Sequence, residues 1–171
     1  MSQSLNWSML QKPVIESLLE LSDCVVQIAL RDDNGCYTAI GPHVRHSLDY
    51  FYALKAGASD GVIDYNSRRR GSPVEHSATA ALSDIAVLLV WLRSVSFDDK
   101  PVRVVAEYSN NSQAIGEFSS SLLREALHVI EHTIHHTAFI VAIAASHDIG
   151  LNERAGVAAA TQSYRRRARL N

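Results

Sequence analysis

Four of the eight histidines in the chain lie close together, at His128, His132, His135 and His136. Because an α-helix advances by about 100° per residue, a helix over this segment would carry all four rings on one side. The pair His132 and His136 would lie one turn apart and beside the apolar face of that helix. Two imidazoles at this spacing can bind the same ion. The spacing therefore predicts that His132 and His136 are the inward-facing pair and makes them candidates to hold a metal.

A metal site needs a further ligand from a second helix, because two histidines do not complete it. His43 and His46 are the candidates, since both lie in a predicted helix between residues 41 and 57. Helical spacing does not separate these two residues. The competing interpretation is that the histidines are surface residues or hydrogen-bonded polar groups of the core.

Four helices must position these residues. Apolar side chains recur at helical spacing over residues 13–30, 41–57, 73–92 and 121–146. Pro13 and the Gly41-Pro42 pair fit helix starts, and Ser119–Ser121 offers an N-cap to the last helix. The pattern predicts an all-α protein, a single domain over residues 1–171 arranged as a four-helix bundle.

The segment between the third and fourth predicted helices has a different pattern. Over residues 101–108, β-branched side chains alternate with other residues. A turn at Asn110-Asn111 then precedes residues 114–118. This pattern predicts a long, partly β-like connection. Residues 60–73 are predicted to form a loop, and residues 165–169 a small basic tail.

Composition limits the classes of function. The chain has 171 residues and a formal net charge of -2, whereas a general nucleic-acid binder has a basic domain. The two cysteines, Cys24 and Cys36, form no CxxC pair and are typical of thiols in a reducing compartment. No signal-peptide pattern is present, and the longest strongly apolar stretch, residues 139–145, is too short to span a bilayer. We expect a cytoplasmic protein without a nucleic-acid or membrane partner.

Three segments carry a family resemblance. They are Gly-Pro-His-Val-Arg-His-Ser-Leu-Asp-Tyr-Phe at residues 41–51, Ile-Asp-Tyr-Asn-Ser-Arg-Arg-Arg-Gly at 63–71 and Glu-His-Thr-Ile-His-His at 131–136. In them the chain resembles the DinB-like superfamily, also described as YfiT-like metal-dependent hydrolases. The resemblance implies an antiparallel four-helix bundle in which His46, His132 and His136 hold a divalent metal ion.

The resemblance also implies a type of chemistry. Three histidines with an open coordination position suit zinc or nickel, and iron or manganese is compatible with the same ligands. Family members include thiol-dependent transferases and isomerases, so we expect a metal-dependent transferase or hydrolase that acts on a small molecule, with a low-molecular-weight thiol as a partner. The alternative is a non-catalytic, metal-stabilised bundle or a stress-related interaction protein.

Four further residues are candidates for supporting the metal or binding substrate. Asp49 lies one turn from His46 and could accept a hydrogen bond from an imidazole N–H. Tyr65 and Arg68 lie in the loop after the helix that carries His46, where an arginine could bind an anionic substrate. Glu75 could orient a ligand or cap the third helix. For each of the four, solvent exposure or a purely structural role is the competing interpretation.

A second apolar stripe on the last predicted helix indicates assembly. It consists of Leu123, Leu127, Ile130, Ile134 and Val141. A helix with two apolar faces can serve the core with one and a subunit interface with the other. We therefore expect a homodimer.

Overall fold

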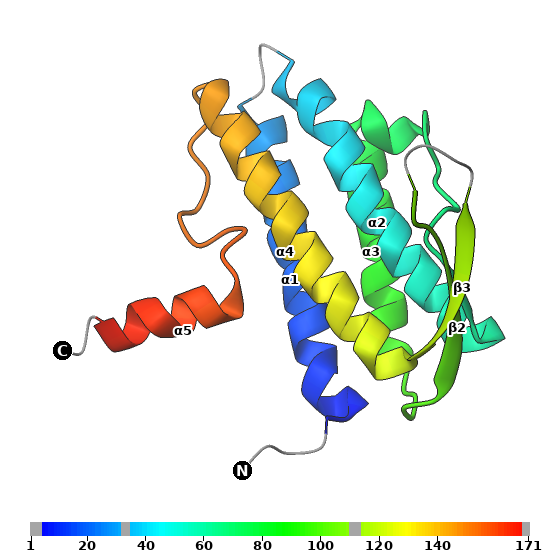
Figure 1. Ribbon diagram of the computed structural model, residues 1–171. Helices are drawn as coiled ribbons and strands as arrows, with labels where there is room; N and C mark the ends of the chain where they lie inside the picture. Colours follow the sequence, from blue (N-terminus) through cyan, green and yellow to red (C-terminus); the bar gives the residue numbers. More distant parts are fainter. Residues whose placement is uncertain (1–4, 32–34, 110–113, 169–171) are drawn as a thin grey trace.

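Residues 5–31, 35–109 and 114–168 are described by the computed structural model of the chain (Figure 1). In these residues the protein is mostly helical, with five α-helices and a small three-stranded sheet. The elements in chain order are α1 (Trp7–Ala29), α2 (Cys36–Asp60), β1 (Val62–Asp64), the 3₁₀ helix η1 (Pro73–Glu75), α3 (Ala78–Ser94), β2 (Pro101–Glu107), β3 (Ile115–Ser121), α4 (Leu122–Ser146) and α5 (Ala159–Ala168). The prediction of a mostly helical protein is confirmed; β2 and β3 lie in the connection predicted to be partly β-like, and β1 is an addition to the prediction.

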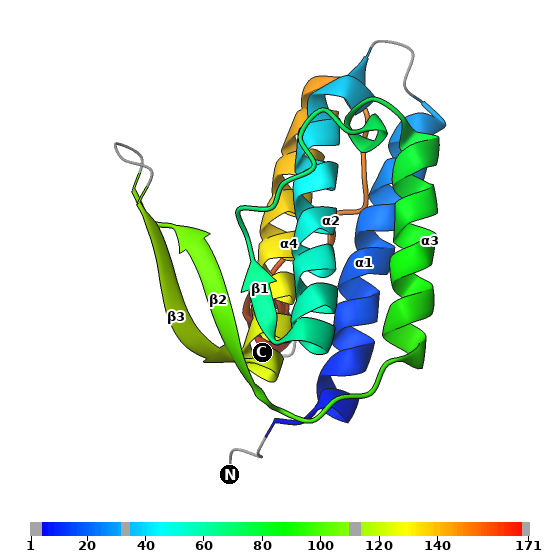
Figure 2. The same ribbon diagram turned by 90° about the vertical axis from the view of Figure 1, so that its right-hand side faces the viewer.

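The four long helices lie side by side (Figure 1, Figure 2). Helix α4 contacts α1 and α2, and α3 contacts α1 and α2. Helices α1 and α4 run in one direction and α2 and α3 in the other, because residues 61–77 return along the length of α2 before α3 begins (Figure 2). Their buried apolar side chains, with Leu18, Phe51 and Leu88 among the largest, form one core cluster.

Helices α1 and α2 begin earlier than predicted, so Pro13 and Pro42 lie inside them. The side chain of Asn6 caps α1 by accepting a hydrogen bond from the backbone N–H of Met9 at 3.1 Å. Trp7 is buried, and this packing stabilises the first turns. Each helix therefore continues past its proline despite the loss of one backbone donor.

Helix α4 agrees with its prediction. Ser121 caps it by accepting a hydrogen bond from the backbone N–H of Arg124, and the helix ends at Ser146. The third predicted helix is divided instead: Pro73 opens the short η1, and α3 begins after Ser77, whose side chain caps it. All four clustered histidines lie within the regular helix α4.

The sheet covers part of the face formed by α2 and α4. Strand β2 pairs antiparallel with β3 within the connection that was predicted to be partly β-like, whereas the predicted turn at Asn110-Asn111 lies outside the described residues. Strand β1 pairs parallel with β2 inside the segment predicted as a loop. A Cβ on Gly57 would collide with the side chain of Ile63, so this glycine allows β1 to approach α2. Three residues are too few for a strand pattern to be recognised in the sequence.

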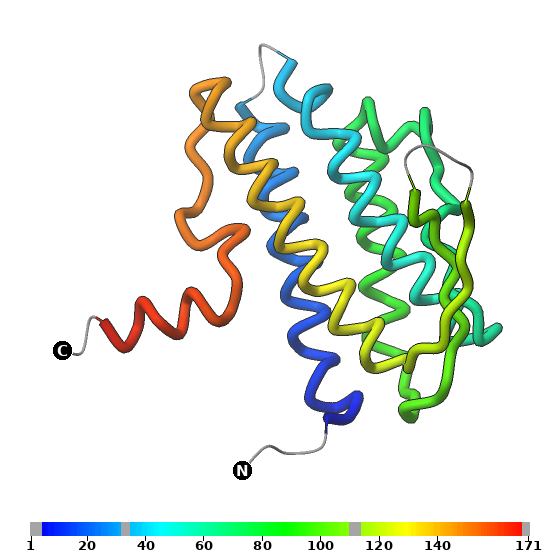
Figure 3. The backbone as a smooth tube through the Cα atoms, in the orientation of Figure 1, coloured from blue at the N-terminus to red at the C-terminus, as the bar shows by residue number. Residues whose placement is uncertain are grey.

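Helix α5 occupies the segment predicted as a basic tail. It includes Arg165, Arg166 and Arg167, has no buried residue and extends sideways from the long helices (Figure 3). Residue 169, the last of the predicted tail, lies outside the described residues.

The second apolar stripe of α4 is largely used within the chain. Leu123 and Ile130 are buried, and Ile134 and Val141 pack against the core, so Leu127 is the exposed member of the stripe. The stripe therefore offers less free surface than the homodimer prediction assumed.

No helix within the described ranges combines the length and the apolar character needed to cross a membrane. Cys24 and Cys36 are both buried.

Candidate metal centre

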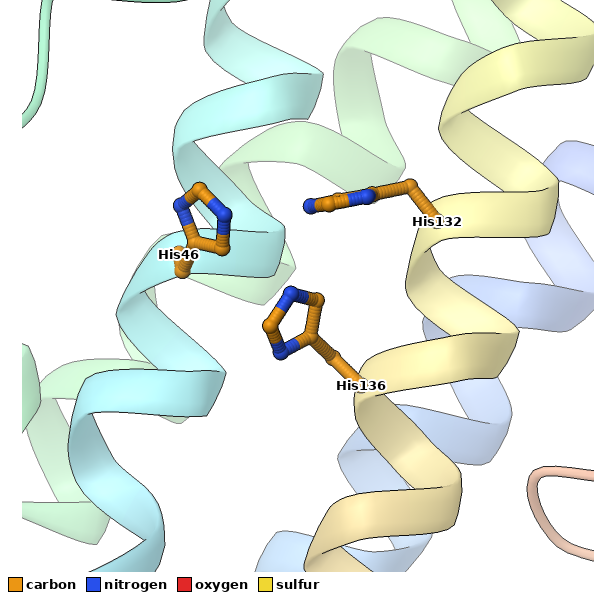
Figure 4. A group of neighbouring side chains, drawn as sticks. All are labelled: His46, His132 and His136. Carbon is orange, nitrogen blue, oxygen red and sulfur yellow. The ribbon is translucent and has the colours of Figure 1, made fainter. Parts of the chain in front are cut away.

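Helices α2 and α4 bring three histidines together (Figure 4). His46 comes from α2, and His132 and His136 come from successive turns of α4. One ring nitrogen from each residue lies within 4.8 Å of the other two. The ring centroids are 4.6 to 4.9 Å apart, and all three residues are half-buried. We call these three residues the histidine group.

The separation of the nitrogens suits a single ion. Zinc binds imidazole nitrogen at about 2.0–2.1 Å, so two ligands of a tetrahedral ion lie about 3.4 Å apart. The nitrogens of the histidine group, within 4.8 Å of one another, would move closer together when they bind an ion. Among the described residues, no further histidine, cysteine or carboxylate belongs to the group.

Two nitrogens of the group have no hydrogen-bond partner. His46 Nδ1 and His132 Nε2 are buried, and neither is paired with any described residue. A buried polar group left in this way costs about 1–3 kcal/mol. Nε2 of His132 points toward the other two rings, so a metal ion between the rings would provide its partner, whereas Nδ1 of His46 points away from them (Figure 4). The position of His132 Nε2 therefore fits a metal ligand set.

His43 forms a hydrogen bond with the ring of His136. Their Nδ1 atoms are 2.9 Å apart, so one ring donates its N–H to the other. The contact occupies His136 Nδ1 and leaves Nε2 of the same ring for an ion. The ring of His43 also stacks on Phe139, with centroids 5.5 Å apart. The structure thus separates the two candidates on α2: His46 belongs to the histidine group, and His43 orients one of its members.

Burial lowers the pKa of each member of the histidine group. The pKa falls to about 4 for His46, about 3 for His132 and about 4 for His136, mainly because the rings lose contact with water. Neighbouring positive charge adds to the effect, chiefly that of Arg68 on His46 and that of the other histidines on His132. All three rings are neutral at neutral pH, which is the form that binds a metal.

A stack of aromatic rings continues from the histidine group. Tyr50 lies against His132 at 3.8 Å between centroids and against Tyr65 at 4.3 Å, nearly parallel to both. The ring of Tyr50 also packs nearly perpendicular to the ring of His46. Sequence analysis did not single out Tyr50, although its position one turn after His46 was a usable signal.

Asp49 and Glu75 are held by arginines. Asp49 binds Arg45 at 2.9 Å and Arg69 at 2.8 Å, and Glu75 binds Arg45 at 2.8 Å. Among the described residues, no hydrogen bond joins Asp49 to a histidine. The structure therefore places Asp49 in an ion pair and not behind His46.

The ion pairs extend to a third helix. Arg69 binds Asp84 of α3 at 2.6 Å and lies over the ring of Tyr52. A Cβ on Gly41 would collide with the backbone of Glu75, so this glycine lets η1 lie against α2. We call the resulting set the ion-pair cluster; it consists of Arg45, Asp49, Arg69, Glu75 and Asp84.

Tyr65 and Arg68 lie beside the histidine group without belonging to it. The hydroxyl of Tyr65 donates a 2.6 Å hydrogen bond to the buried carboxylate of Glu125, and burial raises the pKa of Tyr65. Arg68 is exposed; its charge adds to the effect of burial in lowering the pKa of His46, and it partly offsets the rise that burial causes in the pKa of Tyr50. The hydroxyl of Tyr65 is thus used within the protein, whereas the guanidinium of Arg68 is exposed.

No family model, no curated protein and no solved structure matches this chain. The arrangement itself defines the available chemistry. Three imidazole ligands leave a tetrahedral ion with one open position for water or another small ligand.

Proposed function

We propose that the protein is a metal-dependent enzyme whose ion is held by His46, His132 and His136. The observation that carries the proposal is the convergence of three neutral imidazoles, one of which, His132, has a buried Nε2 with no hydrogen-bond partner among the described residues. Structural zinc sites are usually closed by four protein ligands, whereas catalytic sites keep a position open. A group of three histidines corresponds to the second type.

Zinc or nickel is the proposed ion, since both favour imidazole ligands, and iron or manganese can bind the same set. When bound, such an ion lowers the pKa of a coordinated water or thiol and makes it a nucleophile at neutral pH. The chain itself orients the site: His43 fixes the ring of His136, and Tyr50 covers one face of His132.

The resemblance to the DinB-like superfamily supports the type of reaction. We propose a DinB-like four-helix bundle that transfers a low-molecular-weight thiol to a small electrophile or hydrolyses a small molecule. A homodimer in the cytoplasm belongs to the same proposal, and light scattering at micromolar protein concentration would test the dimer.

The reaction is tested with untagged protein loaded with zinc or nickel. The assays are the consumption of glutathione or cysteine in the presence of chlorodinitrobenzene and the hydrolysis of a nitrophenyl ester. We expect turnover by the metal-loaded protein and by His135→Ala, which alters an exposed histidine of the same helix. We expect none from metal-free protein or from His132→Ala.

Turnover that persists in metal-free protein or in His132→Ala would overturn the proposed function. A protein that binds metal but shows no metal-dependent turnover in either assay would favour the alternative, in which the ion only joins α2 to α4.

A further inference from the structure

A cavity of about 560 Å³ lies between the β2–β3 hairpin and helices α2 and α4. Figure 2 shows this hairpin standing beside α4, with β1 next to it. The residues that matter for recognition on its wall are Tyr50, Tyr65, Arg68, Tyr108, Phe118 and His128. A volume of this size suits a small organic ligand.

The cavity adjoins the histidine group through Tyr50. This ring lines the cavity and also stacks on His132. The charge of Arg68, on the same wall, acts on His46. No member of the histidine group lines the cavity, so the ring of Tyr50 would separate a ligand in the cavity from His132.

Arg68 is a cation without a carboxylate partner among the described residues. Its neighbour Arg69 is ion-paired with Asp49 and Asp84, whereas the contact that Arg68 makes is a 3.5 Å approach of Nε to the backbone oxygen of Tyr65. A guanidinium presents a planar set of donors that matches a carboxylate or a phosphate. Its fork is thus available to a ligand.

The carboxylates of the cavity wall leave this charge uncompensated. Glu125 has a side chain that is only 1% exposed, and it accepts hydrogen bonds from Tyr65, Ser120 and Arg124. Glu107 is exposed on β2, where water screens its charge. The cavity wall also holds a donor that has no acceptor among the described residues, the side-chain nitrogen of Asn66.

We propose that this cavity is the substrate pocket and that it takes a small molecule with a planar apolar body and an oxyacid anion, which Arg68 binds. Its meaning as a substrate pocket rests on the proposed metal function. The aromatic rings of Tyr108 and Phe118 contact the apolar body, and the guanidinium of Arg68 contacts the anion. A carboxylate and a phosphate share this chemistry.

Calorimetric titration with benzoate, phenyl phosphate and neutral benzamide tests the pocket in metal-free and in zinc-loaded protein. We expect at least one of the two anions to bind both forms more tightly than benzamide. Arg68→Gln should weaken that binding by about 10- to 100-fold, as expected for a hydrogen bond to a charged group. Arg70→Gln, a change in the same run of arginines but outside the cavity wall, should leave it within about twofold.

A cavity-filling variant keeps the test independent of Arg68. Ala106 lies on the wall, so Ala106→Phe should abolish binding of the anion while zinc content and the circular dichroism spectrum stay unchanged. Equal anion affinity in wild type and Arg68→Gln would overturn the proposal, as would the absence of binding by both anions. Binding that needs zinc and ignores Arg68 would place the anion on the ion and also overturn it. If the wild-type protein binds the anion but binds no zinc, the result would count against the proposed function alone.

Discussion

Adjacent residues of α2 belong to two different polar regions. Arg45 belongs to the ion-pair cluster, where its guanidinium binds the carboxylates of Asp49 and Glu75. His46 belongs to the histidine group, where its Nδ1 is buried with no hydrogen-bond partner among the described residues. Both regions are partly shielded from water, and both join α2 to other parts of the chain.

The difference lies in the charges that each region brings together. Each arginine of the ion-pair cluster faces a carboxylate of opposite charge, although Nη2 of Arg69 is a buried donor with no partner among the described residues. The histidine group collects three neutral imidazoles and no carboxylate, and Nε2 of His132 has no hydrogen-bond partner among the described residues. We infer that the ion-pair cluster holds the fold, whereas the histidine group is built for an ion from outside.

The largest effect is expected from Asp49→Ala. The change removes one carboxylate partner from each of two arginines, the buried Arg45 and the partly exposed Arg69. Removing one partner of a buried ion pair costs about 3–5 kcal/mol, and we expect the free energy of unfolding in urea to fall by about 3 kcal/mol. Zinc content of the folded fraction should not change.

Glu117→Ala is the matched control, because its ion pair with Arg103 is half exposed on both sides. It should cost no more than about 1 kcal/mol. An Asp49→Ala protein that keeps its stability but loses zinc would reverse the roles of the two regions.

The next effect is expected from His43→Ala. Without its hydrogen bond, the ring of His136 loses its fixed orientation. Loss of such a supporting contact costs about 10- to 100-fold in metal affinity, which competition with a chelator measures. His135→Ala is the control, since His135 touches the ring of His136 but makes no hydrogen bond to it among the described residues. Equal metal affinities in His43→Ala and His135→Ala would show that His43 does not orient the ring of His136.

The smallest effect is expected from mild acid. At about pH 5.5, a histidine with an ordinary pKa of about 6.5 is roughly 90% protonated, and three such ligands would lose about a thousandfold in metal affinity. The lowered pKa values of the histidine group, about 4, 3 and 4, keep its rings neutral at that pH. Protons compete with the metal only below these values. Zinc affinity should therefore fall by less than about threefold between pH 7 and 5.5, and a thousandfold loss would show that the rings titrate as exposed histidines do.

The elements with the strongest periodicity could be predicted from the sequence. Helix α4 follows its apolar seam and its serine cap, so its bounds agree with the prediction. The starts of α1 and α2 could not be found in this way, because tertiary packing of residues such as Trp7 extends the helices across their prolines. Strand β1 depends on pairing with β2, a distant segment, and leaves no local pattern.

The candidate site, like the fold, could be predicted only in part from the sequence. The i, i+4 spacing identified His132 and His136, because that spacing determines where side chains lie on one helix. The choice between His43 and His46 depends on how α2 is rotated against α4, which one helix alone does not specify. The role of Asp49 depended on Arg69, which is distant in sequence and near in space.

The most direct test of the central claim is the zinc content of untagged protein, measured by elemental analysis after loading and gel filtration. We predict about one ion per chain for wild type and for His135→Ala, and little or none for His46→Ala, His132→Ala and His136→Ala with unchanged circular dichroism spectra. Full zinc occupancy in His46→Ala and His136→Ala would contradict the account.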